Sequence, residues 1–175
     1  PQAALIGCCI PTGIGAAMFN AKINPGSTVV IVGVGGVGLN IVQGARLLSA
    51  SKIIAIDPNE SALEFATQFG ATNTINPTER DPVEAVKVIT GGSGSDYAFE
   101  AFGSSETVET AYNSVRKGGT VIVVGLTPLG DDPMIDAKRL TRPENTLKRP
   151  IYCSVRSALD VTRMVNYFTI STIYI

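Results

Sequence analysis

Histidine is absent from this 175-residue sequence, and tryptophan is absent as well. A Ser-His-Asp triad or a Cys-His pair needs an imidazole as its base, and catalytic zinc sites usually include at least one histidine ligand. The missing histidine therefore excludes both nucleophilic arrangements within this chain. It also argues against a complete zinc site built from this chain alone.

Cysteines, long apolar runs and blocks of like charge are scarce too. Three cysteines, two of them adjacent at Cys8 and Cys9, do not make the disulfide framework of a secreted scaffold, so we expect reduced thiols. No uninterrupted apolar run reaches the ~18 residues of a membrane span, and the opening PQAALIGCCIPTG lacks the basic region of a signal peptide. The 14 basic and 15 acidic residues nearly cancel, which does not favour nucleic acid or an anionic membrane as a partner. We expect a soluble, cytoplasmic protein.

The composition that remains, 45% hydrophobic and 17% charged, is typical of a globular protein, and the length suits one domain over residues 1–175. Short β-branched runs alternate along it with segments of helical spacing. The expected strands are Thr28–Val34, Lys52–Asp57, Thr72–Ile75, Asp96–Phe102 and Thr120–Val124. The expected helices are Val37–Leu48, Glu60–Phe69, Pro82–Ile89 and Ser105–Val115. This alternation predicts an α/β fold, a doubly wound parallel Rossmann sheet in three αβα layers.

The last part of the chain is less regular. Residues Thr127–Pro143 are rich in Pro, Asp and Gly, and we expect them to loop out. Beyond them, Thr146–Val155 could form another strand and Ala158–Phe168 another helix.

Four glycines follow the first expected strand in the stretch IVGVGGVGL, residues 31–39. In a strand-to-helix turn of this type, Gly33 allows the tight turn, Gly35 leaves room for a pyrophosphate, and Gly38 lets the helix pack close to the strand. The helix that begins there directs its N–H groups and positive dipole end at the phosphates. The motif therefore predicts a dinucleotide site.

Asp57 ends the next strand, at the spacing of roughly 20 residues that dinucleotide-binding folds use. A carboxylate there accepts hydrogen bonds from the ribose hydroxyls and repels a 2′-phosphate, which favours NAD over NADP. From these residues alone, three alternatives to an NAD site remain: a glycine turn that binds no ligand, a methyltransferase that binds S-adenosylmethionine, and a flavoprotein.

The chain resembles a known family in a series of linked motifs. The segments ALIGCCIPTGIGA (residues 4–16), NPGSTV (24–29), GVGGVGL (33–39) and IIAIDPN (53–59) resemble the cofactor domain of zinc-dependent medium-chain alcohol dehydrogenases. The resemblance extends from about Gln2 to about Met164. It implies a zinc enzyme that transfers a hydride reversibly between an alcohol and NAD, with the zinc polarising the alcohol oxygen.

The resemblance also implies roles for single residues. Cys8 matches the cysteine that completes the catalytic zinc site, and Thr12 matches the catalytic threonine beside the nicotinamide. Residues that match the rest of the cofactor pocket are Gly36 and Val37 in the glycine turn, Ala101 and Phe102 near the adenosine, and Val124 and Leu126 near the nicotinamide. Without the resemblance, we would interpret Cys8 as a small buried residue, and the apolar residues matched to the cofactor pocket as core or pocket lining.

Some positions depart from the family pattern. Ala62 stands where many relatives have a lysine on the ribose, and Ser104 stands where an arginine is frequent. Residues 146–155 resemble the edge strand through which two such domains pair, so a homodimer is expected, although Pro150 removes one backbone donor.

The resemblance further implies that residues 1–26 lead in from a separate catalytic domain and that residues 146–175 are a truncated end. We therefore expect a fragment that lacks the other zinc ligands and is inactive alone. Two alternatives remain at this point: a zinc-free reductase similar to quinone reductases, and a dinucleotide-binding module without enzymatic activity. For the alcohol dehydrogenase, the resemblance implies a small alcohol or aldehyde as the substrate.

Overall fold

A parallel sheet of six strands forms the centre of the molecule in the computed structural model, which describes residues 7–136, 138, 144–150 and 155–169. The strands are β1 (Thr28–Val32), β2 (Lys52–Ile56), β3 (Asn73–Ile75), β4 (Ser95–Glu100), β5 (Val115–Val123) and β6 (Thr146–Lys148). Their spatial order is β3-β2-β1-β4-β5-β6, and every neighbouring pair is parallel. This order is that of a Rossmann sheet, so the predicted fold class is confirmed.

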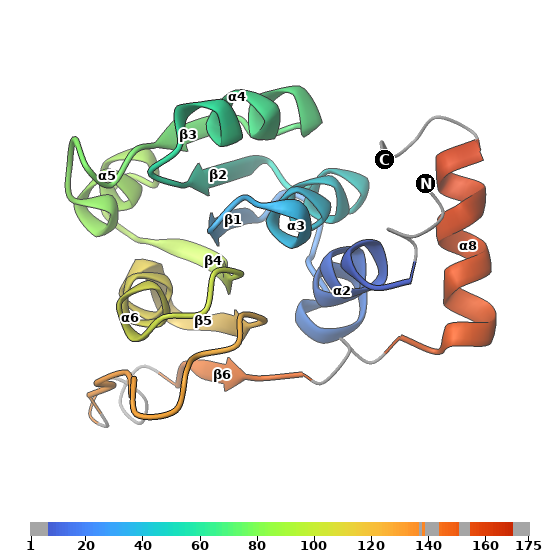
Figure 1. Cartoon of the computed structure of the whole chain (residues 1–175). Helices are drawn as coiled ribbons and strands as arrows, with labels where there is room; N and C mark the ends of the chain where they lie inside the picture. Colours follow the sequence, from blue (N-terminus) through green and yellow to red (C-terminus); the bar gives the residue numbers. More distant parts are fainter. Residues whose placement is uncertain (1–6, 137, 139–143, 151–154, 170–175) are drawn as a thin grey trace.

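Helices cover both faces of this sheet. The connections between strands contain α3 (Gly36–Leu47), α4 (Glu60–Phe69), α5 (Pro82–Ile89) and α6 (Ser105–Ser114). Before β1, α2 (Cys9–Gly15) continues into a π-helical turn, η1 (Ala16–Ala21), and α8 (Ser157–Thr169) follows β6. Figure 1 shows α2 and α3 on one side of the sheet and α5 and α6 on the other, which gives three layers.

The alternation of side chains along β1 divides the core between the two faces. Val29 and Ile31 pack with residues of α3 and α4, whereas Val30 and Val32 pack with residues of α5 and α6. All four side chains are buried, as expected for a central parallel strand that is covered on both faces. This placement leaves the ends of the strands, rather than the faces, as the surface on which a ligand can lie.

Local signals explain the bounds of the connecting helices. The Asn59 side chain accepts from Ser61 N at the start of α4, and the helix ends at Gly70, which has φ 119°. The Asp81 carboxylate caps α5, where Pro82 occupies the first turn. Ser104 and Thr107 form a capping box at α6. These signals are local, and α4 and α5 have the predicted bounds.

The strand β5 differs from its prediction because it begins at Val115 rather than Thr120. Val115 pairs with Ser95, and the register then shifts so that Thr120 pairs with Tyr97. Arg116 lies in this irregular stretch, and its Nε donates to Asp96 Oδ1 over 2.7 Å. The extra residues therefore form a bulge that is attached to β4 by an ion pair.

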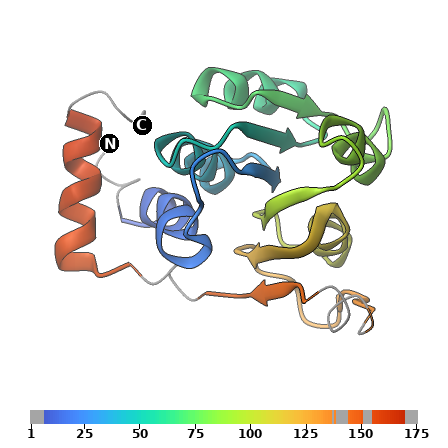
Figure 2. The same ribbon diagram turned by 180° about the vertical axis from the view of Figure 1, so that it is seen from behind.

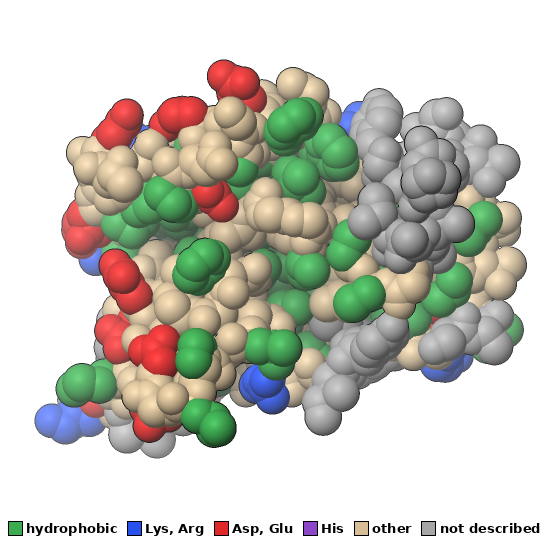
Figure 3. Space-filling model, viewed as in Figure 1, with side chains coloured by type: hydrophobic (Ala, Val, Ile, Leu, Met, Phe, Trp, Pro, Cys, Tyr) green, Lys and Arg blue, Asp and Glu red, His purple; other side chains and the backbone are tan. Residues whose placement is uncertain are grey.

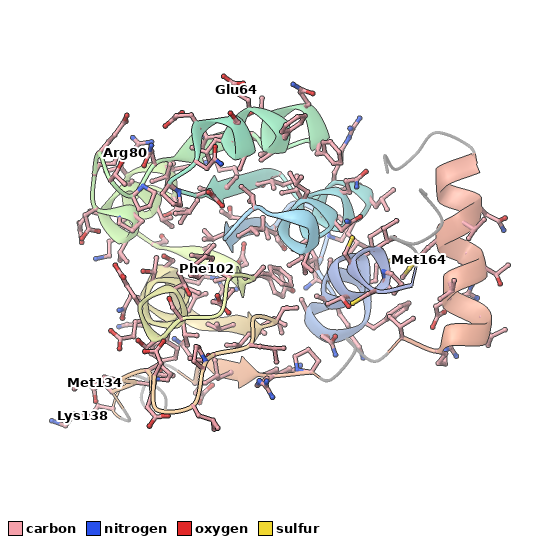
Figure 4. All side chains as sticks on the ribbon, in the orientation of Figure 1. Glu64, Arg80, Phe102, Met134, Lys138 and Met164 are labelled. Carbon is pink, nitrogen blue, oxygen red and sulfur yellow. The ribbon has the colours of Figure 1, made fainter. Side chains whose placement is uncertain are left out.

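The other end of the chain packs at the periphery. In Figures 1 and 2, β6 lies at one edge of the sheet and α8 stands beside α2. Met164 points from α8 towards α2 (Figure 4), where it joins Ile10 and Ile14 in a small apolar cluster. The described part of β6 is shorter than predicted, and residues 151–154 of the predicted strand lie outside the described residues. Among the helices of the described ranges, none has the length and apolarity needed to cross a membrane.

Candidate functional site

The glycine turn between β1 and α3 has three glycines in three different environments. Gly33 has φ 85°, and a Cβ there would approach Phe102 to 3.1 Å. A Cβ on Gly38 would lie 2.0 Å from the carbonyl oxygen of Gly33, so no side chain fits at that position. A Cβ on Gly35 would meet nothing within 4 Å. Close packing thus explains Gly38, whereas the open space at Gly35 is where a ligand backbone could approach.

The start of α3 presents unpaired helical amides at this open space. Gly35 is the N-cap residue with extended backbone, and the N–H groups of the first helical turn have no acceptor within the helix. The first turn of α3 contains no acidic side chain. Such a helix start attracts anions through its N–H groups and the helix dipole.

Asp57 follows β2 and lies against the same turn. Its Oδ2 accepts from Val34 N over 2.9 Å, and its Oδ1 accepts from Asn59 N over 2.9 Å. Each carboxylate oxygen retains a further lone pair, because a carboxylate can accept about four hydrogen bonds. The two backbone bonds therefore orient Asp57 without using up its capacity for a ligand.

A cavity of about 520 Å³ opens beside Gly33 and Asp57. It lies where the loops that follow β1, β2, β3 and β4 meet, which is the strand end at which doubly wound sheets bind ligands. Its charged lining consists of Asp57, Asp81 and Glu106, and no Lys or Arg is among the described residues that line it. Acidic side chains also gather over α4, α5 and α6 on the face shown in Figure 3. The cavity therefore disfavours an extra phosphate group.

Three of the predicted site residues, Gly33, Asp57 and Phe102, line this cavity. Residues that the sequence reasoning missed make up the rest of the lining: Val32, Ile56, Pro58, Pro77, Thr78, Asp81, Pro82, Val83, Ser104, Glu106, Thr107 and Thr110. The signal that could have found some of them is their position after an expected strand. Pro77 and Thr78 follow β3, and Ser104 follows β4.

Phe102, which lines the cavity and is 72% exposed, lies beyond the end of β4 beside α6 (Figure 4). Ala101, Val124 and Leu126 do not line the cavity but follow the same ends of β4 and β5, and Ala101 packs against the buried core. Val124 is partly buried after β5, and Leu126 is 77% exposed. Gly103 brings these loops together, since a Cβ there would lie 2.7 Å from the Leu126 carbonyl oxygen.

Helix α2 packs beside the glycine turn, since a Cβ on Gly36 would lie 3.9 Å from Cys9 Sγ. Cys8 is the exposed N-cap residue of α2, and Thr12 N donates to its carbonyl oxygen over 3.0 Å. A Cβ on Gly13 would lie 2.6 Å from the Val37 carbonyl oxygen, so α2 packs closely on the first turns of α3. The Asn40 amide donates to Gly36 O over 2.8 Å and to Cys9 Sγ over 3.6 Å, which links the two helices. The pKa of the Cys9 thiol is raised, mainly by burial and to a smaller extent by the neighbouring Cys8.

Comparison with known proteins assigns the chain to a family. The family model of zinc-binding dehydrogenases matches residues 36–166. The chain belongs to the zinc-binding dehydrogenase family. It is similar to S-(hydroxymethyl)glutathione dehydrogenases of Synechocystis sp., with 42% identity over 130 residues, and of Photobacterium damsela subsp. piscicida, with 42% identity over 133 residues. These matches cover 73% and 75% of this chain but only 35% and 36% of the two relatives.

Solved structures of dehydrogenases share the fold over nearly the whole chain. Benzyl alcohol dehydrogenase from Acinetobacter calcoaceticus matches 96% of the chain with a TM-score of 0.92 and 34% identity. The matched part is 46% of that protein. This zinc-binding dehydrogenase chain therefore corresponds to the Rossmann, NAD-binding domain of the family, which was the family predicted from its motifs.

The residues described here do not fit a complete zinc site of the family. Within the described ranges, no group of three or more His, Cys, Asp or Glu side chains is arranged to hold a metal ion. Cys8 is exposed and could supply one thiolate, but a catalytic zinc takes three protein ligands. Zinc binding through Cys8 therefore requires further ligands from outside the described residues.

Proposed function

We propose that this chain binds NAD as the cofactor domain of an alcohol dehydrogenase. The observation that carries the proposal is the contact between the glycine turn and Asp57, whose Oδ2 accepts from Val34 N. Gly33 and Asp57 line one cavity whose described lining has no Lys or Arg, and the turn leaves open space at Gly35. The pyrophosphate lies at Gly35, Gly36 and the start of α3, where helical N–H groups are available. The adenosine ribose bonds to the free lone pairs of Asp57.

The remaining predicted residues extend this proposed site towards the nicotinamide. Phe102 and Ala101 flank the adenosine half, and Val124 and Leu126 lie along the nicotinamide half. Val37 contacts the dinucleotide at the glycine turn. Thr12 lies against the nicotinamide ring on α2, one helical turn after Cys8. When bound, NAD supplies a ring that accepts a hydride from an alcohol carbon. The part of this chain is to orient that ring and to exclude water around it.

A chimera tests this function, because the chain spans only about a third of the length of the Synechocystis relative. In the chimera, this chain replaces the matching segment of that relative. We expect alcohol-dependent NADH production by the chimera and none by the 175-residue chain alone, because Cys8 is the only residue of its sequence that matches a zinc ligand of the family. Cys8→Ser in the chimera should abolish both turnover and stoichiometric zinc while leaving NADH binding intact.

Two results would count against the proposal. Alcohol oxidation by the chain alone would show that the reacting groups lie elsewhere than proposed. Full turnover by the Cys8→Ser chimera would show that the proposed zinc ligand is not needed, which would favour a zinc-free reductase.

We also propose that the chain forms a homodimer through the edge of the sheet. β6 is an edge strand in the described part of the sheet, and its residues, including Leu147, are exposed. An exposed edge strand is a template for pairing with a second chain. Light scattering well above micromolar concentration should give twice the monomer mass, and a monomer under these conditions would contradict the proposal.

A further inference from the structure

A buried carboxylate at the end of β4 has no part in the site described so far. Glu100 is fully buried, with 0% of its surface exposed. Its Oε1 accepts three hydrogen bonds, from Phe102 N over 2.8 Å, from Gly103 N over 2.6 Å and from Thr107 Oγ1 over 2.9 Å. Its Oε2 is buried and has no hydrogen-bond partner among the described residues. Burying a carboxyl group costs free energy unless its oxygen atoms are hydrogen-bonded, and the three bonds to Oε1 offset part of this cost.

The backbone of Glu100 is attached to a second loop. Its carbonyl oxygen accepts from Val124 N over 2.8 Å and from Gly125 N over 3.2 Å, just after β5 ends. The side chain also packs against this loop, since a Cβ on Gly125 would lie 2.5 Å from Oε2. Glu100 therefore binds the loop after β4 with its side chain and the loop after β5 with its backbone.

Both loops belong to the proposed cofactor site. Phe102, Ser104 and Thr107 line the cavity, and Val124 lies in the nicotinamide half. Thr107 is part of the capping box that starts α6, so its bond to Oε1 also connects the carboxylate to that helix. In the sheet, Glu100 pairs with Val32, the residue that precedes Gly33 of the glycine turn.

We propose that Glu100 is a positioning residue that sets the affinity for the dinucleotide by holding the two loops after β4 and β5 in their binding geometry. The proposal rests on the proposed NAD function, since it deepens the account of the same site. Glu100 is too deeply buried to touch the cofactor, and it acts through the backbone of Phe102 and Gly103. Its Oε1 brings three donors to one point and so links the amides of Phe102 and Gly103 to the hydroxyl of Thr107.

The opposite end of β4 offers a matched control. Asp96 also accepts a backbone N–H, from Thr28 over 2.8 Å, and it pairs with Arg116. It lies on the same strand but at the end away from the cavity, so Asp96→Ala removes similar bonds without touching the cofactor loops. A purely structural role of Glu100 would make the two alanine variants alike in binding.

The experiment measures NADH affinity by calorimetry and amide exchange by NMR in the 175-residue chain. We expect Glu100→Ala to weaken NADH binding by about tenfold or more, because three hydrogen bonds to the loop are lost. Glu100→Gln keeps an acceptor of the same shape and should bind within about threefold of the wild type. Asp96→Ala should leave the affinity unchanged while lowering the Tm.

Amide exchange separates this proposal from the proposed function. Without any ligand, Phe102 N–H and Gly103 N–H should exchange at least about tenfold faster in Glu100→Ala than in wild type or Asp96→Ala. If the wild type binds no NADH, the NAD function fails, and this exchange comparison still decides whether Glu100 holds the loop.

Three results would overturn the proposal. These are wild-type affinity in a folded Glu100→Ala variant, unchanged exchange of both amides in it, and binding by Glu100→Gln as weak as that of the alanine variant. Should Glu100→Ala not fold, Thr107→Val removes one donor and leaves the acid in place. Faster exchange at Phe102 and Gly103 in Thr107→Val then supports the proposal, and unchanged exchange with unchanged affinity refutes it.

Discussion

Two glycines of the same turn, Gly38 and Gly35, should respond oppositely to alanine. In Gly38→Ala the new Cβ would lie 2.0 Å from the carbonyl oxygen of Gly33 and 2.9 Å from its carbonyl carbon. Both are backbone atoms, so the overlap can be relieved only if α3 moves away from the turn. In Gly35→Ala the Cβ points into open space, and the residue has φ −70°, which suits alanine. Only the second variant should keep the stability of the wild type.

The expected magnitudes follow from this geometry. Overpacking of a backbone contact costs typically 1–3 kcal/mol, and the severe overlap at Gly38 places this variant at about 3 kcal/mol of lost unfolding free energy. For a chain of this length, that loss lowers the Tm by roughly 6–12 °C. Gly35→Ala should change the unfolding free energy by less than about 0.5 kcal/mol. Its Cβ occupies the space proposed for the pyrophosphate, so NADH affinity should fall by about tenfold or more.

Calorimetric unfolding and NADH titration of both variants check this pair of predictions. The expected pattern is a lowered Tm for Gly38→Ala and a native Tm with weak binding for Gly35→Ala. Unchanged NADH affinity in Gly35→Ala would refute the placement of the pyrophosphate at this turn. Unchanged stability in Gly38→Ala would refute the packing argument.

Two further predictions concern charged groups near the cavity. A 2′-phosphate with a charge of −1.5 to −2 at about 5 Å from Asp57 is repelled by roughly 1.2–1.7 kcal/mol in water, so NADH should bind about tenfold more tightly than NADPH. Calorimetry should show this gap reduced to about threefold or less in Asp57→Asn, and an unchanged gap would exclude Asp57 as its cause. Hydrogen bonds from the hydroxyl and N–H of Ser105 hold the pKa of Asp131 below its usual value. The hydrogen bonds between Asp131 and Ser105 should therefore be fully formed above pH ~3.9 and be lost as the pH falls through the lowered pKa of Asp131. The NMR chemical shift of the Ser105 amide measures this loss. The same pH-dependent change of that shift in Asp131→Asn would contradict the prediction.

Most helices and strands were predictable because their signals are local. Asn59 and Gly70 mark the two ends of α4, and Asp81 with Pro82 marks the start of α5. The early start of β5 was not predictable in this way. Arg116–Gly119 reads as a turn, and only the pairing of Val115 with Ser95 and the ion pair to Asp96 make it part of the sheet.

The candidate site was predictable only where a motif lies in one stretch of sequence. Gly33 and Asp57 belong to such a motif, and both line the cavity. Asp81 and Glu106 follow other strands, and they reach the cavity because the strand order places the ends of β1, β3 and β4 together. Glu100 gave no signal of its own, since its three donors become neighbours only when the loop after β4 folds back over the carboxylate.

The proposed NAD site lies at the end of the sheet beside Gly35 and Asp57. A calorimetric titration of NADH into the 175-residue chain, without added metal, tests it most directly. We expect one binding site per chain, with an affinity that Gly35→Ala lowers strongly. Absence of binding in the folded wild-type chain, or binding that Gly35→Ala leaves unchanged, would contradict the claim.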